Sequence, residues 1–133
     1  MSVSDAAGGC PAVRTVIRTA YRGDDAVRDV RAIAEETPVA LTYNRTSYAV
    51  MLATPADLED FAVGFSLTEG VVRSAVEIEE LETVVVDAGI ELRMWLAAER
   101  VEAMARRQRR IAGPSGCGLC GLESLADVVR VPP

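Results

Sequence analysis

Two cysteines separated by two residues carry the most evident chemistry of this sequence. Cys117 and Cys120 stand in the string Gly116-Cys117-Gly118-Leu119-Cys120-Gly121. Because glycine has no Cβ, the three glycines leave the backbone free and the sulfur atoms sterically open. If a helix follows from Leu122, its positive end lowers the pKa of a nearby thiol and favours the thiolate. The pattern therefore predicts a pair of reactive thiols that form a disulfide, bind a metal or pass a sulfur atom between them.

The rest of the composition separates these three uses of a thiol pair. A structural zinc site needs four ligands, but the sequence has no histidine and its third cysteine is the distant Cys10. We therefore expect no metal site within the chain. A thioredoxin-like redox pair remains open, although such a motif is expected near a βαβ pattern. Cys10 itself is interpreted as an incidental thiol.

Length and charge set the class of protein. The chain has 133 residues, half of them apolar, which is enough for one modest core. A net charge of −6 argues against general nucleic-acid binding. No apolar run reaches the roughly 20 residues that a membrane-spanning helix needs. The first residues have no positively charged region of the kind that opens a secretory signal, so we expect a cytoplasmic protein.

The periodicity of apolar residues predicts an α+β fold with a mainly antiparallel sheet and two packed helices. Residues 90–96 alternate between apolar and polar, as a half-buried strand does. Further strands are expected at 13–21, 39–43, 47–53 and 83–87, and the glutamate-rich stretch 77–82 is expected to be solvated. Helices are expected from 54 to about 70, from 99 to 110 and from Leu122 onward. We divide the chain into a disordered tail (1–12), an α+β domain (13–111), and a cysteine loop that opens a second domain (112–133).

Three segments together resemble a known family. The cysteine string followed by Leu122-Glu123-Ser124-Leu125 is similar to the signature of the FdhD/NarQ accessory proteins. Upstream, residues 36–44 (ETPVALTYN) resemble an early strand of these proteins. Residues 54–70 (TPADLEDFAVGFSLTEG) are close to a family hallmark. Three matches in the right order are more specific than a cysteine pair alone.

The resemblance implies a function in sulfur transfer. Proteins of this family take sulfur from a cysteine desulfurase as a persulfide and deliver it to the molybdenum cofactor for formate dehydrogenase. By this resemblance, Cys117 bears the persulfide, Cys120 assists it, and the molybdenum cofactor in its guanine dinucleotide form is a sulfur acceptor rather than a tightly bound group. The chain would then be a sulfurtransferase whose partners are a cysteine desulfurase and formate dehydrogenase, and a homodimer is left open. Family members are about twice as long, and their second half resembles a cytidine-deaminase-like domain, so we assign no cofactor-binding residue here.

Two alternatives to a sulfur carrier stay open. A dithiol oxidoreductase would cycle a disulfide between Cys117 and Cys120 without holding extra sulfur. An inactive fragment would only bind the cofactor or a partner protein, and it would not need the thiols.

Overall fold

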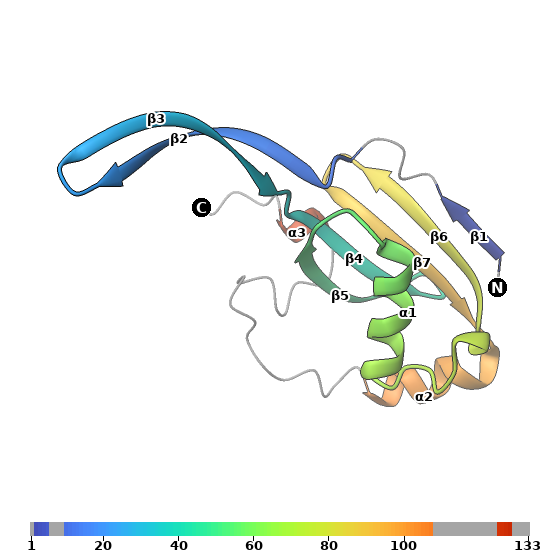
Figure 1. Cartoon of the computed structure of the whole chain (residues 1–133). Helices are drawn as coiled ribbons and strands as arrows, with labels where there is room; N and C mark the ends of the chain where they lie inside the picture. Colours follow the sequence, from blue (N-terminus) through green and yellow to red (C-terminus); the bar gives the residue numbers. More distant parts are fainter. Residues whose placement is uncertain (1, 6–9, 108–124, 129–133) are drawn as a thin grey trace.

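The computed structural model describes residues 2–5, 10–107 and 125–128 as a five-stranded sheet, a separate two-stranded hairpin and helices on both sides of the sheet (Figure 1). The sheet strands are β1 (Ser2–Asp5), β4 (Thr37–Tyr43), β5 (Thr46–Ala53), β6 (Ile78–Val86) and β7 (Gly89–Leu96). The hairpin strands are β2 (Val13–Arg22) and β3 (Asp25–Ala34). The helices are α1 (Leu58–Thr68), the short 3-10 helix η1 (Ala75–Glu77), α2 (Ala98–Arg107) and α3 (Leu125–Val128).

The sheet joins two local hairpins through a parallel pair of central strands. Its order is β1-β6-β7-β4-β5. β4 pairs with β5 and β6 pairs with β7, both antiparallel, as their short turns require. β4 and β7 then pair in parallel, and β1 adds a second parallel pair at the edge beside β6. The predicted α+β class is confirmed: the hairpins are antiparallel, and two parallel pairs make the five-stranded sheet mixed.

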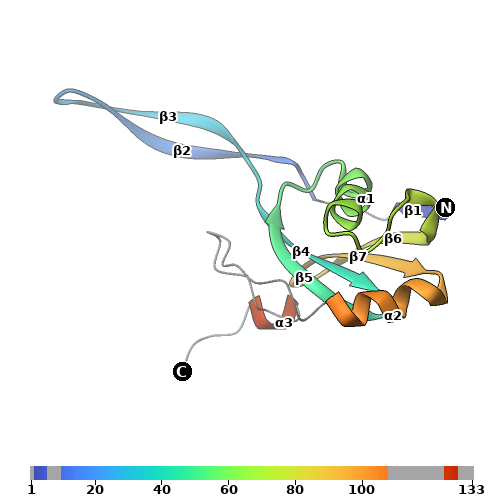
Figure 2. The same ribbon diagram turned by 90° about the horizontal axis from the view of Figure 1, so that it is seen from below.

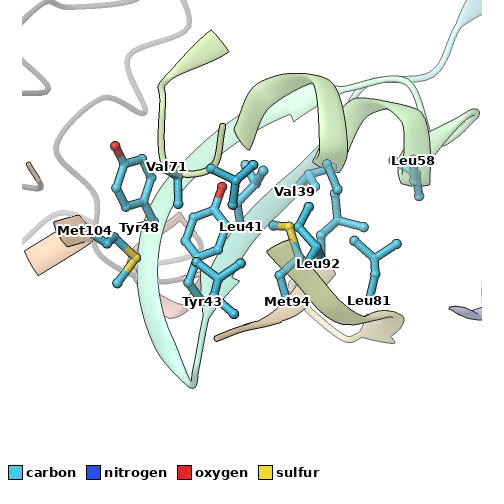
Figure 3. Packing of buried hydrophobic residues seen from close by; sticks show 14 of the residues in the cluster. Val39, Leu41, Tyr43, Tyr48, Leu58, Val71, Leu81, Leu92, Met94 and Met104 are labelled. Carbon is cyan, nitrogen blue, oxygen red and sulfur yellow. The ribbon is translucent and has the colours of Figure 1, made fainter. Parts of the chain in front are cut away.

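Helix α1 covers one face of the sheet, and α3 lies against the other face (Figure 2). Alternate strand residues point toward α1 and build the main core (Figure 3). Helix α1 contributes Leu58 and Ala62 to this core, and α2 contributes Met104. Aromatic rings continue the packing, since Tyr48 lies edge-on to Phe65 at 6.1 Å between ring centroids. The buried strand residues of this core are Val39, Leu41, Tyr43, Tyr48, Ile78, Leu81, Ile90, Leu92, Met94 and Leu96.

One polar contact lies inside this core. The Ser66 hydroxyl donates to the carbonyl oxygen of Ala62 at 2.6 Å, so the Tyr43 hydroxyl donates to Ser66 at 2.8 Å. Burial raises the pKa of Tyr43 above its usual range, and the hydroxyl stays protonated. This bond ties the end of β4 to α1 and satisfies two polar groups that are fully buried.

The turn between β4 and β5 also positions β7. Asn44 and Arg45 both have positive φ (47° and 68°), which is the type I′ geometry of a two-residue hairpin turn. Asn44 tolerates this conformation well, and its side chain then bonds the end of β7 twice. Its Oδ1 accepts from the Leu96 N–H at 2.8 Å, and its Nδ2 donates to the Leu96 carbonyl at 3.2 Å. The turn therefore fastens the two hairpins to each other.

Several expectations for individual elements were wrong. The helix expected from Thr54 begins only at Leu58, because Asp57 adopts a left-handed conformation (φ 51°) and makes no side-chain capping bond. Most of the glutamate-rich stretch, residues 78–82, belongs to β6, where Leu81 is fully buried between the exposed Glu80 and the half-buried Glu82. Residues Ser2–Asp5 form β1, although they were expected in a disordered tail. Gly70 ends the first helix as expected, with φ 64°.

Among the described helices, none has both the length and the apolar character needed to cross a membrane.

Candidate functional site

The residues predicted to carry the chemistry lie outside the described part of the chain. These are Cys117 and Cys120 with their supporting glycines Gly116, Gly118 and Gly121, all within residues 108–124. Their roles therefore stay predictions. The structure does describe both flanks, because α2 ends at Arg107 and α3 begins at Leu125.

Helix α2 is fixed to the body at its first turn and by one buried side chain. Arg100 donates to Glu77 of η1 at 2.6 Å, and the backbone N–H of Arg73 donates to the same carboxylate at 2.7 Å. These two hydrogen bonds, the one from Arg100 first, hold the pKa of Glu77 below its ordinary value. Further along the helix, Met104 is buried in the main core. The chain therefore enters the cysteine segment from an anchored helix.

Helix α3 is anchored on the opposite face of the sheet. Leu125 is only 5% exposed and packs with Ala40 of β4 and Val50 of β5 in a second, smaller core cluster. Val128, one helical turn later, packs against the same cluster. Met104 therefore belongs to the cluster under α1, whereas Leu125 belongs to the cluster on the other face of the sheet.

A groove with a volume of about 540 Å³ opens on this second face, beside Leu125. Its floor is made by the polar sides of the central strands, and its wall includes Leu125 and the exposed Arg45 of the β4–β5 turn. The lining residues are Ala40, Thr42, Arg45, Ser47, Glu82, Glu91, Arg93, Met94, Trp95 and Leu125.

Charge on the groove floor is arranged as one arginine between two glutamates. The Arg93 guanidinium lies 2.7 Å from the Glu91 carboxylate and 3.8 Å from that of Glu82. This side chain is held by the sheet and has little freedom to reach a ligand. Arg45, by contrast, stands on the turn, and the ion pairs found among the described residues do not include it. Of the two arginines that line the groove, Arg45 is therefore the more available to a negatively charged group.

The groove was not predicted as a site, although part of its signal was present in the sequence. The alternation over residues 90–96 places Glu91, Arg93 and Trp95 on one face of β7, which is the face that lines the groove. What the sequence could not indicate is that β4 would lie beside β7, because the two strands are about fifty residues apart and pair in parallel.

Cys10 is the one cysteine within the described residues, and it packs half-buried against the main core. In the described part of the chain, no group of three or more histidine, cysteine, aspartate or glutamate side chains is placed to hold a metal ion. The expectation that the cysteine pair binds no metal stays a prediction.

Comparison with known proteins identifies the family. The family model described as FdhD/NarQ matches residues 34–133, three quarters of the chain. The chain belongs to the FdhD/NarQ family. The matched range includes the whole five-stranded sheet except β1, together with the cysteine pair.

Individual FdhD/NarQ relatives agree with this assignment. A protein of Agrobacterium fabrum named sulfur carrier protein FdhD is 48% identical over 120 residues, which are 90% of this chain and 44% of that protein. A protein of the same name from Cupriavidus necator is 53% identical over 100 residues, 75% of this chain and 35% of that protein. The chain thus spans less than half the length of these relatives.

A solved structure has a similar fold. A protein from Desulfotalea psychrophila, described as a candidate formate dehydrogenase accessory protein, aligns with a TM-score of 0.56 at 26% sequence identity. The alignment covers 66% of this chain and 38% of that one.

Proposed function

We propose that this chain is a sulfur carrier that serves the maturation of formate dehydrogenase, with Cys117 as the residue that holds the sulfur. The observation that carries the proposal is the family match over residues 34–133, which includes the motif Cys117-Gly118-Leu119-Cys120. Relatives about half identical to the chain are named sulfur carriers. A pair of cysteines set among glycines has the open access that sulfur exchange requires.

The first step is a thiol exchange without net oxidation. The Cys117 thiolate attacks the outer sulfur of a donor persulfide, the donor S–S bond breaks, and the electron pair leaves with the donor thiolate. The product is a persulfide on Cys117. The donor we propose is a cysteine desulfurase, which carries its sulfur in this form.

In the second step of the proposed cycle, Cys120 releases the sulfur as sulfide. Its thiolate attacks the inner sulfur of the Cys117 persulfide, a disulfide forms between the two cysteines, and HS⁻ leaves with two electrons. The acceptor we propose is the molybdenum cofactor, as a substrate. A dithiol reductant must then reduce the disulfide, so the cycle belongs in a reducing compartment such as the cytoplasm.

The described structure supports a site beside the groove. Cys120 precedes Leu125 by five residues, and five residues span at most about 18 Å. Since Leu125 lines the groove, we propose that a donor or an acceptor reaches the thiol pair from this face of the sheet. The open groove leaves room for a donor or an acceptor to approach.

The test is the intact mass of the purified chain after incubation with a cysteine desulfurase and cysteine. Wild type should gain a sulfur adduct of about 32 Da that a reductant removes. The adduct should be lost in Cys117→Ala and kept in Cys10→Ser, which is the matched control for a thiol outside the motif. Cys120→Ala should retain the adduct and fail to release sulfide.

Other outcomes would contradict the proposal. A loss of about 2 Da in wild type, together with no adduct in Cys120→Ala, indicates a disulfide that forms without bound sulfur, as expected of a dithiol oxidoreductase. An adduct that persists in Cys117→Ala and is lost in Cys10→Ser would place the reactive thiol elsewhere. No change of mass in any variant would mean that this chain does not carry sulfur by itself.

A further inference from the structure

A second pocket lies on the α1 face of the sheet, between the first turn of α1 and strand β6. Its volume is about 370 Å³, which is at the small end of the range that ligand sites occupy. Pro55 and Leu58 are buried and give the pocket an apolar wall, while acidic residues and one threonine supply its polar groups. The lining residues are Pro55, Ala56, Asp57, Leu58, Glu59, Asp60 and Thr83.

Thr83 distinguishes this pocket from an ordinary surface hollow. Its side chain is only 2% exposed and lies on the same face of β6 as the buried Leu81. The side-chain hydrogen bonds found among the described residues do not include the Thr83 hydroxyl. A buried hydroxyl normally has a partner, because leaving it without one destabilises the fold. Since Thr83 lines the pocket, its hydroxyl is available to a ligand there.

The pocket wall carries more negative charge than the helix end balances. The unpaired backbone N–H groups at the start of a helix amount to about half a positive charge. Asp57, Glu59 and Asp60 add three formal negative charges, and Asp57 makes no capping bond to the helix. The ion pairs found among the described residues include none of these three carboxylates. The electrostatic potential in the pocket therefore favours a cation over an anion such as phosphate.

The arrangement of the carboxylates selects the kind of cation. They do not converge on one point, since no group of three acidic side chains in the described part of the chain is placed to hold a metal ion. A guanidinium group suits acceptors that are spread along a wall, because it presents five N–H donors in a planar fork. The buried Pro55 and Leu58 would then pack against the aliphatic chain that carries the guanidinium.

We propose that this pocket binds a guanidinium group on an aliphatic chain. The Thr83 hydroxyl accepts one of its N–H groups, and Asp57, Glu59 and Asp60 balance its charge. A free small molecule and an arginine side chain of another protein present the same group. The pocket is on the opposite face of the sheet from Leu125, so the proposal does not depend on the sulfur-carrier function.

The test is a titration of the isotope-labelled chain with butylguanidinium chloride, followed by the amide NMR shifts of residues 57–60 and 83. Butylurea is the matched neutral probe, because it has nearly the same shape and carries no charge. Butylguanidinium should bind saturably, and butylurea should bind at least about tenfold more weakly. The blocked tripeptide acetyl-glycyl-arginyl-glycinamide separates the two sources of the group. An affinity similar to that of butylguanidinium indicates an arginine side chain, whereas binding of butylguanidinium alone indicates a free small molecule.

Two variants and one control locate the bound group. Thr83→Val keeps the shape of the side chain and removes the hydroxyl, so it should raise the dissociation constant of butylguanidinium by about tenfold. Glu59→Gln should raise it by at least about threefold. Glu80→Gln is the matched control, because it makes the same change at an exposed position of β6 outside the pocket, and it should alter the constant by less than about twofold.

Thermal unfolding of Thr83→Val separates a lost ligand contact from a damaged fold. Because the hydroxyl is buried without a partner among the described residues, the variant should melt at or above the temperature of wild type. A lower melting temperature would show that the hydroxyl is bonded within the fold, and it would overturn the proposal. Three other results would do the same: no saturable binding, equal affinity for butylguanidinium and butylurea, or an equal effect of Glu59→Gln and Glu80→Gln.

Discussion

Of Gly23, Gly64 and Gly89, Gly89 is the residue at which an added methyl group should lower the free energy of unfolding most. It starts β7 with φ 148°, a backbone conformation essentially confined to glycine. A Cβ at Gly89 would stand 2.2 Å from the Pro38 carbonyl oxygen and 3.1 Å from its carbon. Both atoms are backbone of β4, so no side chain rotation relieves the clash. The parallel β4–β7 pairing, which begins at Val39 and Ile90, would have to shift.

The cost of Gly89→Ala follows from two contributions. Backbone strain costs about 1–3 kcal/mol and the steric overlap about 1–3 kcal/mol more, so the free energy of unfolding should fall by roughly 2–6 kcal/mol. In a chain of this size 1 kcal/mol moves the melting temperature by about 4 °C, which gives a decrease of about 8–24 °C.

Thermal unfolding followed by circular dichroism measures this effect, with two other glycines as controls. In the middle of α1, a Cβ at Gly64 meets no atom within 4 Å, so Gly64→Ala should stabilise by about 0.5–1 kcal/mol. Gly23 in the turn between β2 and β3 has φ 62° and also has open space, so Gly23→Ala should cost only about 1 kcal/mol of strain. The melting temperatures of Gly89→Ala and Gly23→Ala should differ clearly. A difference of less than 3 °C, on the scale of about 4 °C per kcal/mol, would refute the expected clash of a Cβ at position 89 with β4.

Three further outcomes follow from contacts of the fold. Ser66→Ala should lower the free energy of unfolding by about 1–3 kcal/mol, because it leaves the Tyr43 hydroxyl buried without an acceptor. Tyr43→Phe should lower it by only about 1 kcal/mol, and unfolding in urea measures both values. The pKa of Glu77 is lowered in the folded state, so its stabilisation is present above its unfolded pKa and is lost as pH falls through the folded pKa. Arg100→Met should therefore flatten the pH dependence of stability on the acid side of about pH 4.5, and an unchanged acid limb would contradict the assignment. Leu125→Ala should increase amide exchange over residues 125–128 without moving the main melting transition, because α3 packs on the sheet mainly through this side chain; a lowered main transition would show that α3 is part of the global cooperative unit.

The sequence predicted most clearly the strand in which apolar and polar residues alternate, because its apolar residues all lie on one buried face. Residues 90–96 alternate strictly, and they form β7 with Ile90, Leu92, Met94 and Leu96 in the core. The strands around the Asn44-Arg45 turn were found because two short apolar runs are separated by a loop of hairpin length, and Gly70 was found because it ends a helix with positive φ.

The misses have separate physical causes. β6 was only partly predicted because Glu79, Glu80 and Glu82 obscure its short buried series, which becomes clear only when Leu81 is seen opposite Met94. β3 was not among the expected strands, because neither of its faces packs on the body and no burial period appears in its sequence. The thiol pair was recognised from its spacing and its glycines, whereas the groove required β4 and β7 to be brought together from distant parts of the chain.

The central parallel pair also has a consequence for how the chain folds. The β4–β5 and β6–β7 hairpins are local and should each form within about 1–10 μs. Joining β4 to β7 instead closes a loop of about fifty residues that contains α1, which costs more conformational entropy than either turn. We therefore expect the docking of two preformed hairpins to limit the folding rate. The two hydrogen bonds between the Asn44 side chain and the Leu96 backbone would then form during or after that step, and they would stabilise the docked hairpins.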